Sequence, residues 1–128
     1  MEIQILPIDT VEEAEHYGRL EQLIWMSSAE DIVPGHILLT VARNGGGVLG
    51  AYAPDGPMET GGMVGLTMWF PGIDTPATGN PDHRGPQLKI CSHMAGVLPA
   101  WQGKRVACLL GCGWQAERLP YSKPAMVR

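Results

Sequence analysis

One stretch of the sequence constrains the fold more than any other, because an apolar segment is broken by a proline and then resumes. Apolar residues are frequent over residues 88–98, Pro99 follows, and a second apolar segment begins near residue 106 after a polar turn that contains Gly103. Proline interrupts regular backbone hydrogen bonding, and glycine permits the turn that follows. We therefore predict a strand over residues 88–98, a tight turn, and a helix that begins near residue 106 and ends by Pro120.

A junction of this kind offers a binding site for an anion. The first N–H groups of a helix have no partner within the helix, and they lie at the positive end of the helix dipole. A phosphate is stabilised there, and a glycine allows the backbone to approach it closely. The alternative interpretation is an ordinary surface turn that binds nothing.

The N-terminal part of the chain predicts an edge strand followed by a helix. Residues 1–8 alternate loosely and contain Pro7, which is typical of an edge strand. Thr10, with Glu13 three residues later, forms the capping-box pattern at the start of a helix over residues 10–28. Apolar residues recur at helical spacing in this segment, and we expect Glu21 to lie off that stripe. The stripe consists of Val11, Ala14, Tyr17, Leu20 and Ile24.

The middle of the chain predicts a second helix, a hairpin and a long loop. The helix is expected within residues 30–46, with Pro34 in its first turn and Asn44-Gly45 at its left-handed end. Residues 48–52 and 63–70 are expected to pair as antiparallel strands, and residues 71–87 to form a polar loop. This order of elements predicts one α+β domain over residues 1–128, with a mixed, mostly antiparallel sheet flanked by helices.

The chain has a formal net charge of −4, but its two ends differ in sign. Residues 1–35 carry eight carboxylates and one arginine, whereas residues 84–128 carry seven lysines and arginines and one glutamate. The overall acidity argues against nucleic acid as a partner, because such binding depends on phosphate neutralisation. The basic end can attract a small anionic ligand, and the alternative interpretation is a solvated surface without one.

Location and metal binding are constrained mainly by what the sequence does not contain. No apolar run approaches the roughly 20 residues that cross a bilayer, and no basic lead-in precedes an apolar signal core. We therefore expect a cytoplasmic protein without a membrane partner.

The pairs Asp82-His83 and Cys91-x-His93 lack further ligands at a suitable spacing, so we predict no metal site. An odd number of cysteines predicts reduced, buried thiols at Cys91, Cys108 and Cys112.

The segment GVLPAWQGKRVA, residues 96–107, resembles the acetyl-CoA-binding motif of the GNAT N-acetyltransferases. In that motif a strand ending in Val-x-Pro is followed by Gln/Arg-x-x-Gly-x-Gly/Ala. Val97, Pro99, Gln102 and Ala107 stand at the matching positions. The segments IWMSSAEDIVPGHILLTVARNGGGVLGAY and SHMAGV also resemble a subgroup of predicted acetyltransferases of unassigned substrate. The resemblance covers residues 1–110, and residues 111–128 form an atypical tail.

The resemblance implies an N-acetyltransferase that uses acetyl-CoA as cosubstrate and transfers the acetyl group to an unidentified amine. A backbone N–H near Met94 to Val97 would polarise the acetyl carbonyl, and residues 102–107 would hold the pyrophosphate. His93 is the candidate acid–base residue, because imidazole titrates in a suitable range, and the alternative is a structural histidine of the strand. The residues expected to bind the cofactor are Met94, Val97, Leu98, Gln102, Gly103, Lys104, Arg105, Val106 and Ala107.

Two departures from the family pattern bear on activity. Arg105 stands where the family has its central glycine, so its side chain either pairs with phosphate or obstructs the backbone approach. The sequence after residue 110 does not match the family's later strands and helix, and we expect these to be missing or altered, as in a truncated chain. The alternative function is therefore an inactive relative, or a non-catalytic GNAT-like module that self-associates. Because an unfinished sheet leaves an open edge, we expect a homodimer or a larger assembly.

Overall fold

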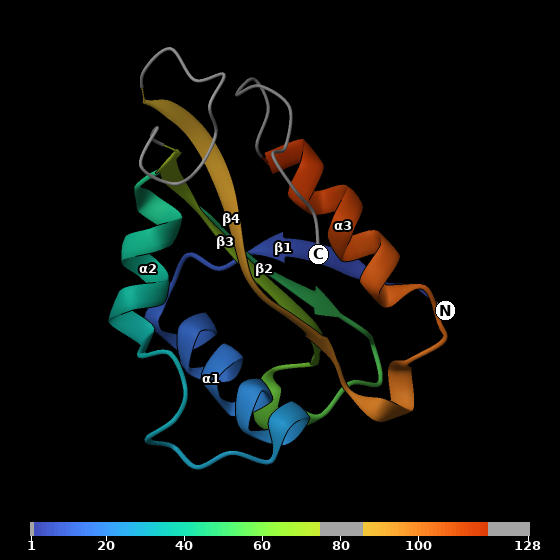
Figure 1. Ribbon diagram of the computed structural model, residues 1–128. Coiled ribbons are helices and arrows are strands. Elements are labelled where there is room, and N and C mark those ends of the chain that lie inside the picture. The colour runs from blue at the N-terminus through green and yellow to red at the C-terminus, as the bar shows by residue number, and fades with distance from the viewer. Residues whose placement is uncertain (1, 75–85, 118–128) are drawn as a thin grey trace.

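Four antiparallel strands form one sheet in the computed structural model, which describes residues 2–74 and 86–117, the last six by their backbone only. The strands β1 (Gln4–Pro7), β2 (Gly47–Tyr52), β3 (Met63–Asp74) and β4 (Gln87–Val97) lie side by side in that order. Helices α1 (Val11–Trp25) and α2 (Gly35–Arg43) cover one face, and α3 (Val106–Glu117) covers the other (Figure 1). Two short 3₁₀ helices, η1 (Met58–Thr60) and η3 (Pro99–Trp101), complete the described elements. The expected α+β architecture is confirmed.

Helix α1 begins at the predicted capping box. The Thr10 hydroxyl accepts from the Glu13 N–H at 3.1 Å, and the Glu13 carboxylate accepts from the Thr10 N–H at 3.0 Å. The same carboxylate accepts from the Asp9 N–H at 2.9 Å, so it pairs two N–H groups just before the helix. The helix ends at Trp25, and its C-cap Met26 has a φ of 54°, which places a non-glycine residue in the left-handed region.

The second helix is shorter than the sequence predicted. Helix α2 begins only at Gly35, after Pro34 at its N-cap, because proline disfavours helical backbone in the residue before it. Residues 30–33 therefore lie outside the helix, which corrects the expected start. Gly45, with φ 90°, provides the left-handed residue at the other end, whereas Asn44 has φ −128°.

Part of the expected loop belongs to the sheet. Strand β3 continues through residues 71–74 and pairs with β4, from Pro71 opposite Ile90 to Asp74 opposite Gln87. Pro71 is tolerated because β2 pairs with β3 only as far as Trp69, so no strand on that side needs its N–H. The rest of the expected loop, residues 75–85, lies outside the described residues, as does the Asp82-His83 pair.

The core lies between the sheet and the helices on both of its faces. Two glycines on neighbouring strands show these contacts. A Cβ on Gly65 of β3 would lie 2.9 Å from Val106 Cγ1 of α3. A Cβ on Gly96 of β4 would lie 2.9 Å from Trp25 Cη2 of α1. The largest fully buried side chains are Trp69, Tyr17, Ile8, Leu20, Leu38, Leu49, Met63 and Leu66, and burial of each apolar one contributes about 1.5–3 kcal/mol.

Burial differs from the sequence prediction at several side chains. Val11 of the expected stripe is 65% exposed, and it is the first residue of α1. Glu21, expected off the stripe, is only 4% exposed, because the chain after α1 folds back over it. The prediction of buried thiols is wrong for Cys108, which is exposed, and Cys91 is half-buried. The Cys112 side chain lies outside the described residues.

Residues 118–128 lie outside the described part of the chain, so the end of the predicted last helix near Pro120 and most of the atypical tail are not placed. Within residues 2–74 and 86–117, no helix combines the length and the apolar character that crossing a membrane requires.

Candidate functional site

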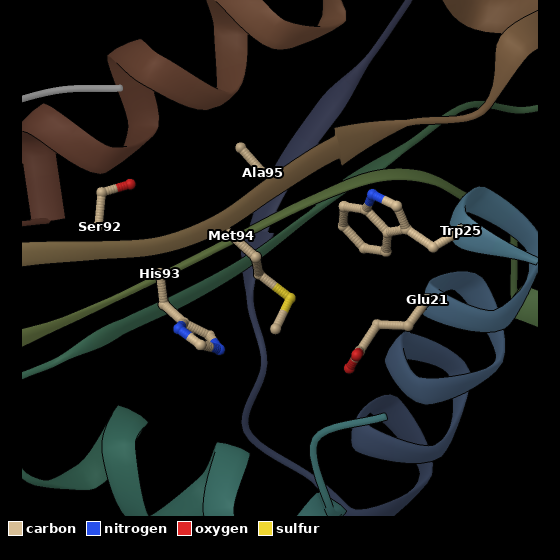
Figure 2. Close-up of a pocket in the computed structure, with 6 residues that line it drawn as sticks. All are labelled: Glu21, Trp25, Ser92, His93, Met94 and Ala95. Atoms are coloured by element: carbon tan, nitrogen blue, oxygen red, sulfur yellow. The ribbon is translucent and has the colours of Figure 1, made fainter. Parts of the chain in front are cut away.

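Strand β4 contains a β-bulge at His93. Met94 pairs with Met68, but the next pair along is Ser92 with Trp69, so His93 has no residue opposite it. The extra residue turns two consecutive side chains to one side, and Figure 2 shows His93 and Met94 both on the side of α1 and α2, with Ser92 and Ala95 on the side of α3. A regular strand would alternate, and nothing in the β4 sequence indicates this interruption.

Strand β4 is also an edge of the described sheet. Its pairing with β3 leaves the backbone groups that face away from β3 without a neighbouring strand among residues 2–74 and 86–117. An edge of this kind can pair with an extended ligand through N–H and C=O groups. The bulge places one irregular position in the middle of that edge.

The turn after β4 is held by its own hydrogen bonds. The Leu98 N–H donates to the Val64 carbonyl at 2.9 Å, and the Trp101 N–H donates to the Leu98 carbonyl at 2.9 Å. The Gln102 side-chain amide donates to the Val97 carbonyl at 3.0 Å, so it joins the turn to the end of the strand. The Gln102 side chain therefore supports the turn.

Two residues of the turn have left-handed backbone. Gly103 has φ 78° and Arg105 has φ 67°. No described atom lies within 4 Å of a Cβ built on Gly103, so glycine is favoured there by backbone conformation and not by lack of space. Arg105 stands where the resembled motif has a glycine and keeps the left-handed backbone that glycine adopts most readily, with its side chain exposed.

Helix α3 directs unpaired N–H groups toward this turn. The Leu109 N–H donates to the Arg105 carbonyl at 3.0 Å, so the N–H groups of Val106, Ala107 and Cys108 have no acceptor within the helix. Val106 is 1% exposed and anchors this end of α3 on the sheet. Two cations accompany the N–H groups: Arg105, and Lys104, whose Nζ lies 5.9 Å from the centre of the Trp101 ring.

On the other side of β4, a pocket brings His93 and Met94 together with Glu21 and Trp25 of α1 (Figure 2). The Glu21 Oε2 accepts from the Val33 N–H at 3.2 Å, whereas its buried Oε1 has no hydrogen-bond partner in the described part of the chain. Burial raises the pKa of the Glu21 carboxyl, and the Val33 hydrogen bond opposes this shift. The pocket therefore contains an incompletely paired carboxyl group.

A second, apolar hollow adjoins this pocket, and His93 lines both. The His93 and Phe70 rings lie 6.2 Å apart between centroids and are tilted by 55°. This apolar hollow is lined by Asp31, Ile32, Val33, Pro34, Ile37, Val41, Met68, Phe70 and His93. The two spaces are therefore adjacent, with the His93 side chain between them.

The residues singled out from the sequence fall into two places. Residues 102–107 gather at the start of α3, whereas His93 and Met94 point to the pocket on the side of α1 and α2 (Figures 1 and 2). Glu21 was missed, although it stands four residues after Tyr17, at a spacing that shares one helix face. Its charge concealed that position in the apolar pattern.

Among the side chains that the structure places, no group of three or more His, Cys, Asp or Glu residues is arranged to hold a metal ion. The Cys91-x-His93 pair is therefore not joined by a third such ligand within the described residues.

The fold is that of the GNAT N-acetyltransferases. An aminoglycoside acetyltransferase from an uncultured soil metagenomic sample, solved with sisomicin, matches with a TM-score of 0.62 at 15% identity, over 99% of this chain and 76% of its own. A ribosomal-protein-alanine N-acetyltransferase from Brucella melitensis biovar Abortus 2308 matches with a TM-score of 0.57 at 15% identity, over 91% and 71%. A Trypanosoma brucei acetyltransferase matches with a TM-score of 0.52 at 17% identity, over 90% and 73%.

The likeness is therefore one of fold, and it confirms the GNAT-like architecture expected from residues 96–107. No protein-family model and no curated protein sequence matches the chain.

Proposed function

We propose that this protein is an acetyl-CoA-dependent N-acetyltransferase that transfers an acetyl group to an amine. The observation that carries the proposal is the left-handed turn at Gly103 and Arg105, which leads into the free N–H groups at the start of α3. This arrangement suits the pyrophosphate of a thioester carrier.

The pyrophosphate is assigned to residues 102–107. The N–H groups at the start of α3 supply uncharged donors, and the helix dipole favours the negative charge. Lys104 and Arg105 add two exposed cations, and no carboxylate occurs between Gly96 and Leu110 to oppose them. Arg105 preserves the backbone conformation and adds a guanidinium that can bind phosphate through two parallel hydrogen bonds.

The acetyl and pantetheine groups are assigned to the free edge of β4. An extended chain of amides pairs with an edge strand in the same way as another strand. The Leu98 N–H is already used by Val64, so the N–H that polarises the acetyl carbonyl belongs to residues 94–97. Val97 and Leu98 then connect this part of the site to the turn.

The reaction is direct attack of a neutral amine on the acetyl carbonyl carbon. The new C–N bond forms, the C–S bond breaks, and the thiolate leaves with a proton from the attacking nitrogen. His93 lies beside Met94 at the bulge, where its imidazole can accept or return a proton. Orientation of the two substrates supplies most of the rate enhancement.

Isothermal titration calorimetry with acetyl-CoA tests the donor site. Gly103→Asp and Gly103→Asn have side chains of the same shape, and both tolerate left-handed backbone, so they differ in charge alone. We expect Gly103→Asp to bind acetyl-CoA about 3- to 30-fold more weakly than Gly103→Asn, from about 0.6–2 kcal/mol of repulsion at a helix start. Equal affinities, or no binding by the unmodified protein at millimolar acetyl-CoA, would reject this site.

A second candidate function, a self-associating module without catalysis, is favoured by one observation. The ends of β3 and β4 carry two exposed apolar side chains, Ile73 at 55% and Leu88 at 66%, and these residues are paired with each other. An exposed strand edge with apolar side chains favours pairing with a second copy. Light scattering of the unmodified chain and of Leu88→Lys tests this. The substitution should convert a dimer to a monomer. If the unmodified chain is already a monomer, self-association is excluded.

A further inference from the structure

We propose that Glu21 binds the acceptor as an ammonium ion and takes its proton, and that the acceptor is an amine with an apolar body. The inference rests on the proposed acetyl transfer for its chemical step. The binding of such an amine is independent of that step and is testable by itself.

Glu21 has the properties of a ligand-binding carboxylate. Only 4% of the residue is exposed, yet it lines the pocket beside Met94 and His93, and Figure 2 shows its carboxyl group directed toward that space. One oxygen is held by the Val33 N–H, and the other is buried without a partner among the placed residues. A buried polar atom gains more from an incoming donor than an exposed one, because no water competes for it.

The pocket favours a cation over a neutral or anionic group. The Trp25 indole lines it from the same helix, and the face of an indole attracts ammonium groups. Among the residues that the structure describes, the titratable groups near Glu21 are Tyr17, one turn earlier on α1, and His93, which lines the same pocket from β4. Asp31, from the chain between α1 and α2, lines the adjoining hollow and adds negative charge near it.

The apolar hollow on the other side of His93 suits the body of the same ligand. Ile37 and Val41 of α2 form one wall, and Met68 and Phe70 of β3 form the other. The hollow adjoins the Glu21 pocket at His93, which lines both, so we place the nitrogen of the ligand at Glu21 and its body beyond the imidazole. The acceptor class that fits is a primary amine on a hydrocarbon or aromatic body.

The chemical step is balanced with Glu21 as the base. The ammonium transfers one proton to the Glu21 carboxylate and becomes a neutral amine, whose lone pair attacks the acetyl carbonyl carbon. The second proton on nitrogen goes to the departing thiolate when the C–S bond breaks. Glu21 then loses its proton to solvent, and the burial that raises its pKa makes its carboxylate a stronger base than an exposed one.

If Glu21 has only a structural role, its hydrogen bond to Val33 matters and its negative charge does not. The Glu21 carboxylate accepts a hydrogen bond from Val33 and so holds the chain before α2 against α1. The same segment packs closely at Gly18, where a Cβ would lie 2.9 Å from Ile32 Cδ1. In Glu21→Gln the amide oxygen can still accept from the Val33 N–H, while the negative charge is lost. The matched control is Glu15→Gln, which removes the same charge from the exposed face of the same helix.

The experiment measures binding of phenethylamine by NMR titration and calorimetry, with 3-phenylpropanoate as a probe of similar shape and opposite charge. We expect Glu21→Gln to weaken phenethylamine binding about 10- to 100-fold and Glu15→Gln to leave it unchanged within about twofold. In the unmodified protein, affinity should rise with pH as Glu21 loses its proton, and Glu21→Gln should abolish this rise. Phe70→Ala should weaken phenethylamine but not ethylamine.

The outcomes distinguish a failure of amine binding at Glu21 from a failure of acetyl-CoA binding at residues 102–107. Unchanged phenethylamine affinity in a folded Glu21→Gln, or equal binding of 3-phenylpropanoate, overturns the role of Glu21. Binding of phenethylamine by a protein that does not bind acetyl-CoA supports the amine site and rejects the proposed transfer. Thermal unfolding of each variant shows that it is folded, and Glu21→Ala, which loses both the charge and the Val33 acceptor, measures the structural contribution separately.

Discussion

The Trp25 ring lies against the backbone of Gly96, so closely that a Cβ at Gly96 would meet its Cη2 at 2.9 Å and its Cζ2 at 3.0 Å. The absence of a side chain on β4 thus lets an aromatic residue of α1 reach the strand. Trp25 also lines the pocket that holds Glu21, so this contact determines the shape of one wall.

Gly96→Ala should displace Trp25 rather than unfold the protein, because Trp25 is 47% exposed and its ring can move. We expect a change in tryptophan fluorescence and a loss of stability below about 1.5 kcal/mol. A double-mutant cycle with Trp25→Ala checks the cause. The two effects should couple by more than about 0.5 kcal/mol, and simple additivity would show that the ring is not what the added methyl group meets.

Gly65→Ala should destabilise the docking of α3 on the sheet. Its Cβ would lie 2.9 Å from Val106 Cγ1 and 3.2 Å from Leu110 Cδ1, and both residues are buried. Overpacking at such a position costs about 1–3 kcal/mol, measurable by urea unfolding. Gly111→Ala is the control on α3, since no described atom lies within 4 Å of its Cβ and alanine is the better helix former by about 1 kcal/mol. It should stabilise the protein, and destabilisation by Gly111→Ala would contradict this packing.

Arg105→Gly should raise the free energy of unfolding by about 0.5–1 kcal/mol, because it relieves a left-handed backbone that costs an L-residue about 1–2 kcal/mol. Met26→Gly tests the same effect at the end of α1, far from the turn, since Met26 has φ 54° and is 88% exposed. Denaturant unfolding measures both. If Arg105→Gly stabilises the protein and also weakens acetyl-CoA binding, the charge of Arg105 contributes to binding at a cost in backbone strain. Destabilisation by both glycines would refute the assigned backbone strain.

Thr10→Ala should lower the free energy of unfolding by about 1 kcal/mol, since it leaves the Glu13 N–H without its cap. Denaturant unfolding of the variant and the unmodified protein measures this.

The hydrogen bonds from Asp9 and Thr10 lower the pKa of Glu13, and burial opposes them. A carboxyl whose pKa falls on folding stabilises the protein above its unfolded pKa and loses that contribution as the pH falls through its folded value. Unfolding measured from neutral pH to pH 3 should therefore show a smaller acid-dependent loss in Glu13→Gln than in the unmodified protein.

Glu21 should have the opposite dependence on pH. Burial raises its pKa above the unfolded value, so the folded protein holds the proton more tightly and stability falls as the pH rises from about 4.5 through the raised pKa. Glu21→Gln should remove that component and leave the protein at least as stable at neutral pH. Unfolding curves collected at half-unit intervals of pH test this, and a stability profile unaffected by the substitution would contradict it.

Local patterns of the sequence determined much of the architecture. The capping box at Thr10 and Glu13, the proline at residue 99 and Gly103 each act through neighbours a few residues away, so they can be recognised without a partner element. The candidate anion site is predictable in the same way, because its donors are backbone groups of one continuous segment. The order of strands and helices then predicted the layers.

The tertiary structure alone decided the side chains that meet across elements. The bulge at His93 arises from the register between β3 and β4, which no property of the β4 sequence specifies. Glu21 is buried where the chain before α2 folds over α1 and donates the Val33 N–H to it. Burial and register depend on residues distant in sequence. They place Glu21, which the sequence predicts at the surface, and His93 of the strand in one pocket.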